Sequence, residues 1–217
     1  MPGKLRLSHE RIIDAAARVA DKGGLGAVSM RSVGSELGVE AMSLYHYVAS
    51  KEALLDALSE WVFSKITIPA SGAPWREALW HRAHSAREVL GAHPWGLGMM
   101  ESRPTPGLSQ LRHYDAMMGH LAAAGFSARL ATTAFASVDA FVFGFVLTES
   151  TLPLDGTPGA EQKLAESVGP DESEFPHLSA MLTELFSSGS YSFGEEFSAG
   201  LTILLEGIEQ RLAGEGN

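Results

Sequence analysis

The chain has 217 residues, enough for one large domain or two small ones, and 45% hydrophobic residues, too many for a disordered protein. It contains no cysteine, which excludes disulfides, thiol nucleophiles and cysteine-based zinc sites. Its formal net charge of −10 excludes a protein that binds nucleic acid over its whole surface.

The charge is distributed unevenly along the chain. Residues 1–51 contain seven Lys or Arg and five Asp or Glu, whereas residues 52–217 contain nine and twenty-one. Only the N-terminal part, with a net charge of +2, can approach a polyanion without repulsion. We therefore expect two domains, 1–51 and 52–217.

No membrane segment is predicted. Lys4 and Arg6 are followed by polar residues instead of the apolar core of a signal peptide. The longest apolar run, residues 140–147, is too short to span a bilayer as a helix. We expect a soluble cytoplasmic protein without a membrane partner.

Four short helices are predicted at the N-terminal end, with serine N-caps and glycine ends. They lie between Ser8 and Gly23, between Ser29 and Gly38, over 40–48 and over 51–66. Asp14 and Arg18 are expected to pair on the outer face of the first helix, because they are four residues apart.

The remaining sequence also predicts helices. They cover 74–92, 95–102, 108–124, 127–152, 178–186 and 194–212. Phe141, Phe143 and Phe145 alternate as in a strand, but the alanine-rich flank favours a helix. Residues 153–176, with four prolines and six acidic residues, predict a mobile surface loop. The predicted fold class is all-α.

The segment 29–52 is typical of a helix-turn-helix. Two short helices meet at Gly38, and the second carries hydroxyl, imidazole and phenol groups that suit base edges and phosphates in a major groove. Lys51, just beyond it, is placed to meet a phosphate. The alternative is a helical hairpin with a solvated polar face, and periodicity alone favours neither.

Residues 8–58 resemble the tetracycline-repressor (TetR) family of bacterial regulators. The matching segments are Ile-Ile-Asp-Ala-Ala (12–16), Gly-Leu-Gly-Ala-Val-Ser-Met-Arg (24–31), Leu-Gly-Val (37–39), Leu-Tyr-His-Tyr-Val (44–48) and Lys-Glu-Ala-Leu-Leu-Asp (51–56). The resemblance implies a three-helix DNA-binding domain that holds double-stranded operator DNA, followed by a larger helical ligand-binding and dimerisation domain. It implies DNA contacts from Met30, Arg31, Ala41, Met42, Ser43, Tyr45, His46, Tyr47 and Lys51, with Leu44 and Val48 as core anchors.

The C-terminal part resembles the regulatory domain of the tetracycline repressors within that family. The matches are Trp75 and the segments 102–105, 125–127 and 145–147. The resemblance implies that 127–152 and 194–212 build a dimeric four-helix bundle. A homodimer also has two copies of the DNA-binding domain, as is required to read two half-sites that lie one turn of the DNA helix, or a multiple of it, apart.

The resemblance does not extend to the tetracycline–magnesium site. The tetracycline repressors hold magnesium with histidine and glutamate, and ungapped matching places Thr67, Arg82, Met99, Ala140 and Thr148 at their drug and metal positions. These side chains do not reproduce the ligands of a hard cation. We therefore expect no metal, no cofactor and a small-molecule effector of another, unknown kind.

An apolar pocket with a few polar groups is the remaining expectation for the second domain. An ordinary core position is the competing interpretation for each candidate, and an internal salt bridge competes with an anionic ligand at Arg87 and Arg103. The candidates are Trp80, His84, Arg87, Trp95, Met99, Met100, Arg103, His113, Met117, Phe141 and Phe145.

The signals for an enzyme are weak. His81 and His84 share a helix face but have no evident third zinc ligand, and His9 with Glu10 lacks the second histidine of a zincin motif. The sequence thus predicts a ligand-responsive repressor without catalytic activity. The alternatives are a helical protein-interaction module and, last, a metal-dependent enzyme.

Overall fold

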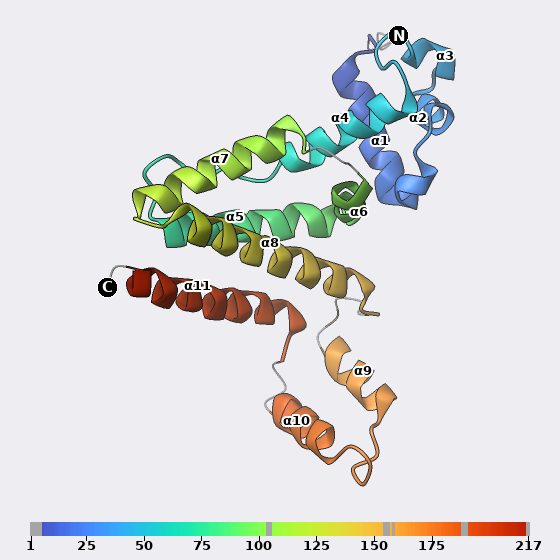
Figure 1. Ribbon diagram of the computed structural model, residues 1–217. Coiled ribbons are helices and arrows are strands. Elements are labelled where there is room, and N and C mark those ends of the chain that lie inside the picture. Colours follow the sequence, from blue (N-terminus) through green and yellow to red (C-terminus); the bar gives the residue numbers. More distant parts are fainter. Residues whose placement is uncertain (1–5, 103–105, 154–156, 158, 188–190, 216–217) are drawn as a thin grey trace.

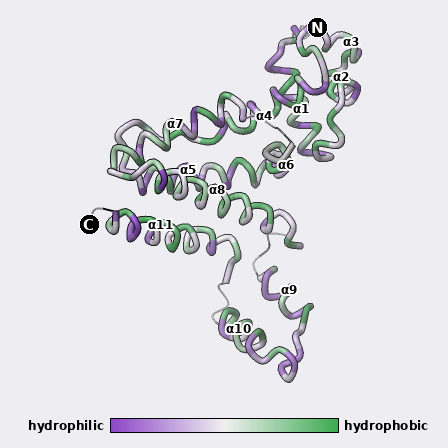
Figure 2. The backbone as a smooth tube through the Cα atoms, viewed as in Figure 1, coloured by the Kyte–Doolittle hydropathy of each residue, from purple (hydrophilic) through white to green (hydrophobic). Residues whose placement is uncertain are grey.

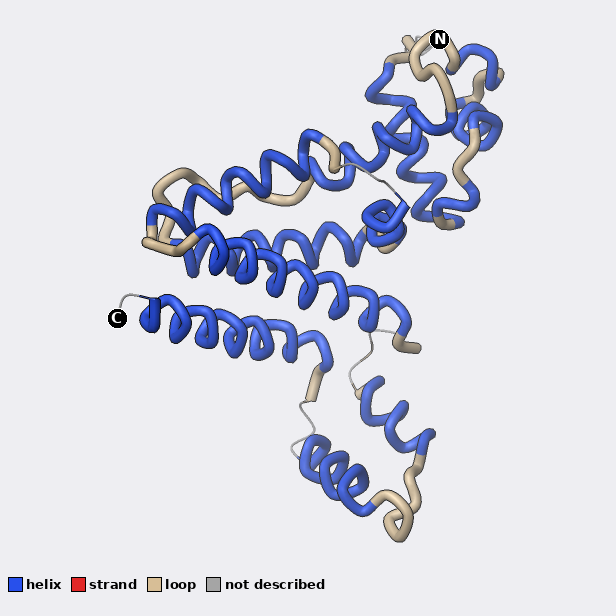
Figure 3. The backbone as a smooth tube through the Cα atoms, viewed as in Figure 1, coloured by secondary structure: helices blue, strands red, loops and turns tan. Residues whose placement is uncertain are grey.

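The computed structural model describes residues 6–102, 106–153, 157, 159–187 and 191–215. Every regular element in these ranges is a helix, which confirms the all-α prediction (Figure 3). Figure 1 shows three parts: a head formed by residues 6–50, a body formed by α5 to α8 with α11, and an arm formed by α9 and α10. Helix α4 runs from the head into the body.

The head contains α1 (His9–Gly23), η1 (Leu25–Ala27), α2 (Met30–Leu37) and α3 (Ala41–Leu44). Ser8 and Ser29 cap α1 and α2 as predicted, and Ser29 forms a reciprocal capping box with Ser32. Helix α3 is shorter than the predicted 40–48, because the backbone N–H groups of Tyr47 and Val48 both bond to the Leu44 carbonyl and tighten the turn.

The predicted pair of Asp14 with Arg18 is wrong. Arg18 donates to Glu36 of α2 at 2.9 Å, and Asp14 accepts a 2.8 Å hydrogen bond from the indole N–H of Trp61 on α4. Partners on neighbouring helices replace the local pair.

Helix α4 (Lys51–Ser64) leads from the head into the body, which contains five further helices. They are α5 (Trp75–Ala92), α6 (Trp95–Ser102), α7 (Leu108–Ala123), α8 (Ala128–Thr151) and α11 (Glu196–Glu215). Helix α8 lies between α5 and α11 (Figure 1) and packs on α7 as well. The alternating Phe141, Phe143 and Phe145 lie inside α8, as the helical interpretation predicted.

Helix α8 carries hydrophobic residues along most of its length (Figure 2). By length and composition it is the one described helix that can cross a membrane. The apolar segment is therefore longer than the run of residues 140–147 on which the sequence prediction was based. One face of the helix, with the fully buried Val138, Val142 and Val146, packs into the body.

The arm corrects the prediction of a continuous loop at 153–176. It contains α9 (Ala160–Val168) and α10 (Pro176–Ser187), and η2 (Phe193–Glu195) leads back to α11. The prolines do not interrupt these helices: Pro170 follows the left-handed Gly169 that ends α9, and Pro176 is the first residue of α10, where no backbone N–H is needed.

Candidate nucleic-acid interface and ligand cavity

The turn between α2 and α3 depends on two glycines. Gly38 ends α2 in the left-handed region with φ +68°, which glycine adopts without strain. Gly34 lies where a Cβ atom would stand 2.9 Å from the carbonyl oxygen of Val39, closer than carbon and oxygen pack. Gly38 turns the chain, and the absence of a side chain at Gly34 lets α3 pack closely across α2.

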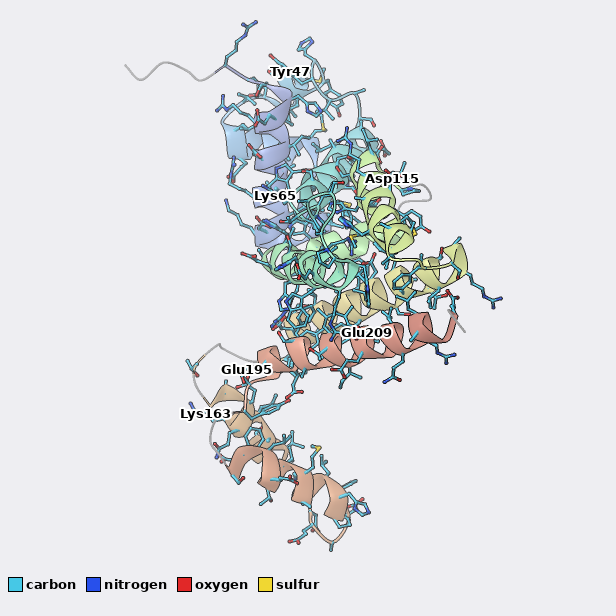
Figure 4. The ribbon with its side chains drawn as sticks, turned by 90° about the vertical axis from the view of Figure 1, so that its left-hand side faces the viewer. Tyr47, Lys65, Asp115, Lys163, Glu195 and Glu209 are labelled. Carbon is cyan, nitrogen blue, oxygen red and sulfur yellow. The ribbon has the colours of Figure 1, made fainter. Side chains whose placement is uncertain are left out.

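Helix α3 and the turn after it have a buried side and an exposed side. Leu44 and Val48 are buried in the head, as predicted for anchors. Tyr45 is 46% exposed and Tyr47 42% exposed, and the side chain of His46 is exposed between them. Figure 4 shows Tyr47 at the end of the molecule farthest from the arm. The head therefore presents phenol and imidazole groups to solvent at its tip.

The other predicted DNA contacts fall into three groups. Arg31, Met42 and Lys51 are exposed, and Ser43 and Ala41 are half-buried. Met30 is only 7% exposed and belongs to the core of the head, so its side chain is removed from the candidate set.

A hydrogen-bonded cluster joins α1 to the body. Asp21 accepts a 2.6 Å hydrogen bond from the indole N–H of Trp95, and the same carboxylate oxygen lies 2.7 Å from Nδ1 of His93. The Trp61 ring of α4 stacks on Trp95 with centroids 6.1 Å apart. Trp95 thus lies at the junction of head and body, where the indole has a structural partner.

A cavity of about 350 Å³ lies in the body between α4, α5, α7 and α8. Most of its wall is aromatic or aliphatic, and Arg82, Asp139 and His113 supply the charged or titratable groups. The lining residues are Phe63, Arg82, Pro106, Gln110, Leu111, His113, Tyr114, Phe135, Asp139 and Phe143.

Two buried polar atoms of this wall have no hydrogen-bond partner. Arg82 forms a bidentate ion pair with Asp139, but its Nε is unpaired. His113 bonds to the Phe63 carbonyl through Nε2 at 3.1 Å, while its Nδ1 is unpaired. Burial, with a smaller effect from Arg82, lowers the pKa of His113. Burial therefore favours the neutral ring.

A larger cavity of about 790 Å³ lies between the 68–75 loop and the C-terminal half of α7, on which Figure 4 labels Asp115. Its polar neighbour His120 bonds to the Ala73 carbonyl through Nδ1 at 3.0 Å. The described wall contains no buried side-chain polar atom without a partner, unlike that of the smaller cavity.

The eleven pocket candidates do not come together in one site. Of the described ones, only His113 lines the smaller cavity. Five others form a packed aromatic layer between α5, α8 and α11, centred on the fully buried Phe197. These five are Trp80, His84, Arg87, Phe141 and Phe145.

Within this layer Arg87 has a polar partner, whereas the buried Nε2 of His84 has none. Arg87 forms an ion pair with Glu149, with Nε 3.1 Å from the carboxylate, as the salt-bridge alternative predicted. His84 packs between Trp80 and Phe197, and burial lowers its pKa, with smaller contributions from Arg87 and His81. Met99 and Met117 are core residues, whereas the Met100 side chain and Arg103 lie outside the described residues.

Among the described residues, no group of three or more His, Asp or Glu side chains is arranged to hold a metal ion. At the positions matched to the tetracycline–magnesium site, Arg82 is paired with Asp139 and Met99 is buried. Thr148 donates its hydroxyl to the Gly144 carbonyl within α8. These side chains do not form a hard-cation site.

Sequence reasoning missed most of the smaller cavity. Phe63 lies on α4, Arg82 on α5, and Phe135 with Asp139 on α8, and nothing local links these three stretches of the chain. The detectable signal was His113, a polar residue on the inward face of a helix. Asp14 and Asp21, which bind the tryptophans at the junction, also looked like solvated surface residues.

Comparison with known proteins gives two family matches. Residues 12–58 match the model described as bacterial regulatory proteins, tetR family, and residues 68–212 match that of the tetracyclin repressor-like C-terminal domain. An HTH-type transcriptional regulator of Saccharopolyspora erythraea is 30% identical over 93% of this chain and 84% of its own length. The class D tetracycline repressor protein of Escherichia coli is 30% identical over 95% of this chain and 91% of its own. The structure of ActR from Streptomyces coelicolor in complex with actinorhodin is similar with a TM-score of 0.74 and 25% identity, covering 98% of this chain and all of that one.

Proposed function

This chain belongs to the TetR family of bacterial transcriptional regulators, and from that membership we propose that it is a cytoplasmic repressor that a small molecule releases from its operator. The observation that carries the proposal of DNA binding is the exposed polar side of the turn after α3, where Tyr45, His46 and Tyr47 are held by the buried Leu44 and Val48. It lies within residues 1–51, which have a net charge of +2, whereas DNA repels the acidic remainder of the chain. Its relatives are regulators, and we propose no catalytic role.

The head supplies two kinds of contact in this proposal. Tyr45, His46 and Tyr47 offer hydrogen bonds to base edges and phosphates, with Ser43 beside them, and Met42 offers apolar contact to a thymine methyl. Arg31 and Lys51 neutralise phosphates at either side of α3. The remaining candidate, Ala41, is half-buried and contributes close packing against the groove.

A homodimer brings two heads to one operator. Helices α8 and α11 pack on each other and expose apolar side chains, including Leu147 at 57% and Ile203 at 70% exposure. An apolar face of this kind is stable in water when a second copy covers it in a four-helix bundle. Two-fold symmetry then predicts a palindromic operator.

The smaller cavity is connected to the head by hydrogen bonds. His113 of the cavity wall bonds to the carbonyl of Phe63 on α4, and Trp61 of the same helix bonds to Asp14 on α1. A ligand that changes the position of α4 therefore changes the position of α1 and of the recognition surface. Release from the operator requires that the ligand bind the DNA-free arrangement of the protein more tightly than the DNA-bound arrangement.

The test is selection of binding sites from random duplex DNA by the purified protein at two salt concentrations. We expect enrichment of a palindrome and an affinity that falls as salt rises, because phosphate contacts release counterions. Tyr45→Ala should abolish the enrichment without loss of folding. If the parent protein enriches no sequence, the proposal fails and the interaction-module alternative gains support.

A further inference from the structure

The wall of the 350 Å³ cavity defines what kind of molecule it accepts. Phe63, Phe135 and Phe143 contribute aromatic surface from α4 and α8, and Leu111 and Tyr114 contribute apolar surface from α7. The volume lies within the range of small-molecule sites, roughly 300–1,000 Å³. This lining favours a flat, apolar molecule of about two fused rings.

The charges in this wall cancel. Arg82 is nearly fully buried and forms two hydrogen bonds with Asp139, and its guanidinium also lies 4.6 Å from the centre of the Phe135 ring. A ligand carboxylate would meet an arginine that is already neutralised. Because an unpaired charge in an apolar site is costly, the cavity selects an uncharged ligand.

The unpaired atoms define the polar group of that ligand. The Phe63 carbonyl can only accept, so Nε2 of His113 carries the ring proton. In the neutral ring, Nδ1 is then an acceptor, whereas the unpaired Nε of Arg82 is a donor. Each is a buried polar atom without a partner, and such an atom favours binding of a group that satisfies it.

A hydroxyl group on an aromatic ring is both a hydrogen-bond donor and an acceptor, and so complements one unpaired donor and one unpaired acceptor. We propose that the effector is an uncharged hydroxyarene whose hydroxyl accepts a hydrogen bond from Arg82 Nε–H and donates one to His113 Nδ1. This inference rests on the proposed function, of which it names the effector class. The aromatic body of the ligand lies against the phenylalanine side chains, and a methyl or carboxylate in place of the hydroxyl leaves one or both atoms unsatisfied.

The test uses three naphthalenes of similar size and the full-length protein without DNA. Isothermal titration compares 2-naphthol, 2-methylnaphthalene, which lacks the hydroxyl, and 2-naphthoate, which is an anion. We expect 2-naphthol to bind at least about tenfold more tightly than either, because it alone satisfies donor and acceptor together. Equal affinities, tighter binding of 2-naphthoate, or no binding of 2-naphthol would overturn the proposal.

A matched pair of variants locates the site. His113→Phe removes the acceptor but leaves the Nε–H donor of Arg82, and should reduce the preference for 2-naphthol over 2-methylnaphthalene below that of the parent protein. His120→Phe changes another buried histidine of α7 that faces the larger cavity, and should keep the preference. The ligand series on the parent protein remains decisive if His113→Phe does not fold.

The outcomes separate this inference from the proposed function. Palindrome selection without a preference for 2-naphthol supports the DNA-binding proposal and overturns the hydroxyarene. A preference for 2-naphthol without DNA selection supports the hydroxyarene as a ligand and overturns the DNA-binding proposal. Release of selected DNA by 2-naphthol, but not by 2-methylnaphthalene, supports both.

Discussion

Replacing Asp21 with alanine should loosen the junction between head and body. Its carboxylate accepts the indole N–H of Trp95, which is buried, and approaches His93. Without Asp21 the indole donor has no partner, and a buried unpaired donor costs about 1–3 kcal/mol. The pairing with His93 adds little, because one-third of the Asp21 side chain is exposed and screened by solvent. We therefore expect Asp21→Ala to lower the free energy of unfolding by about 1–3 kcal/mol.

Urea unfolding measures this loss at one fixed protein concentration, since the stability of the proposed homodimer depends on concentration. The control is Asp115→Ala, which removes an exposed acid of α7 and should change stability by less than about 0.5 kcal/mol. A double-mutant cycle with Trp95→Phe isolates the hydrogen bond, because Asp21→Ala should cost much less once the indole N–H is gone. If the two losses add within about 0.5 kcal/mol, the bond does not hold the junction and the reasoning is refuted.

Four further predictions follow from other features. Tyr45→Ala should weaken operator binding by at least about tenfold in a gel-shift assay with no change in unfolding, because the ring is exposed; unchanged affinity would remove Tyr45 from the interface. Gly34→Ala should destabilise the head by about 1–3 kcal/mol through the contact with the Val39 carbonyl, whereas Gly119→Ala on α7 of the body, with open space around its Cβ position, should raise the stability of the protein or leave it unchanged in the same urea titration. Burial lowers the pKa of His84 in the folded state, so at pH values below the ordinary pKa of 6.5 the unfolded state binds more protons than the folded state. The free energy of unfolding should therefore fall as the pH drops through 6.5, and His84→Phe should flatten this dependence on pH. Calorimetric titration with tetracycline and magnesium should detect no micromolar binding, and such binding would show that the metal-site reasoning is wrong.

The sequence predicted the features that depend on neighbours within four residues. Ser8 and Ser29 cap their helices, and Gly38 ends α2, because a cap or a left-handed residue acts on its own turn. The expected pair of Asp14 and Arg18 failed for the opposite reason. Trp61, 47 residues away, offers Asp14 a partly buried partner that the local pattern cannot reveal.

The same difference explains the cavity. Helical periodicity predicted that His113 faces inward, and it does. Periodicity does not say which helix lies opposite, so His84, Arg87 and the cavity residue His113 were grouped although they face different neighbours. The cavity becomes visible only when helices α4, α5, α7 and α8 are placed together.

Helix α4 connects the two ends of this system with a single rigid rod. Its 14 residues extend over about 21 Å, from Lys51 beside the recognition surface to the turn beyond Phe63 at the cavity. A tilt of about 5° at the cavity end displaces the other end by about 2 Å over that length. In a two-fold dimer both heads move, so their separation changes by up to about 4 Å, comparable to the 3.4 Å rise of one DNA base pair. A small rotation around a ligand is thus enough to put the two heads out of register with the DNA helix.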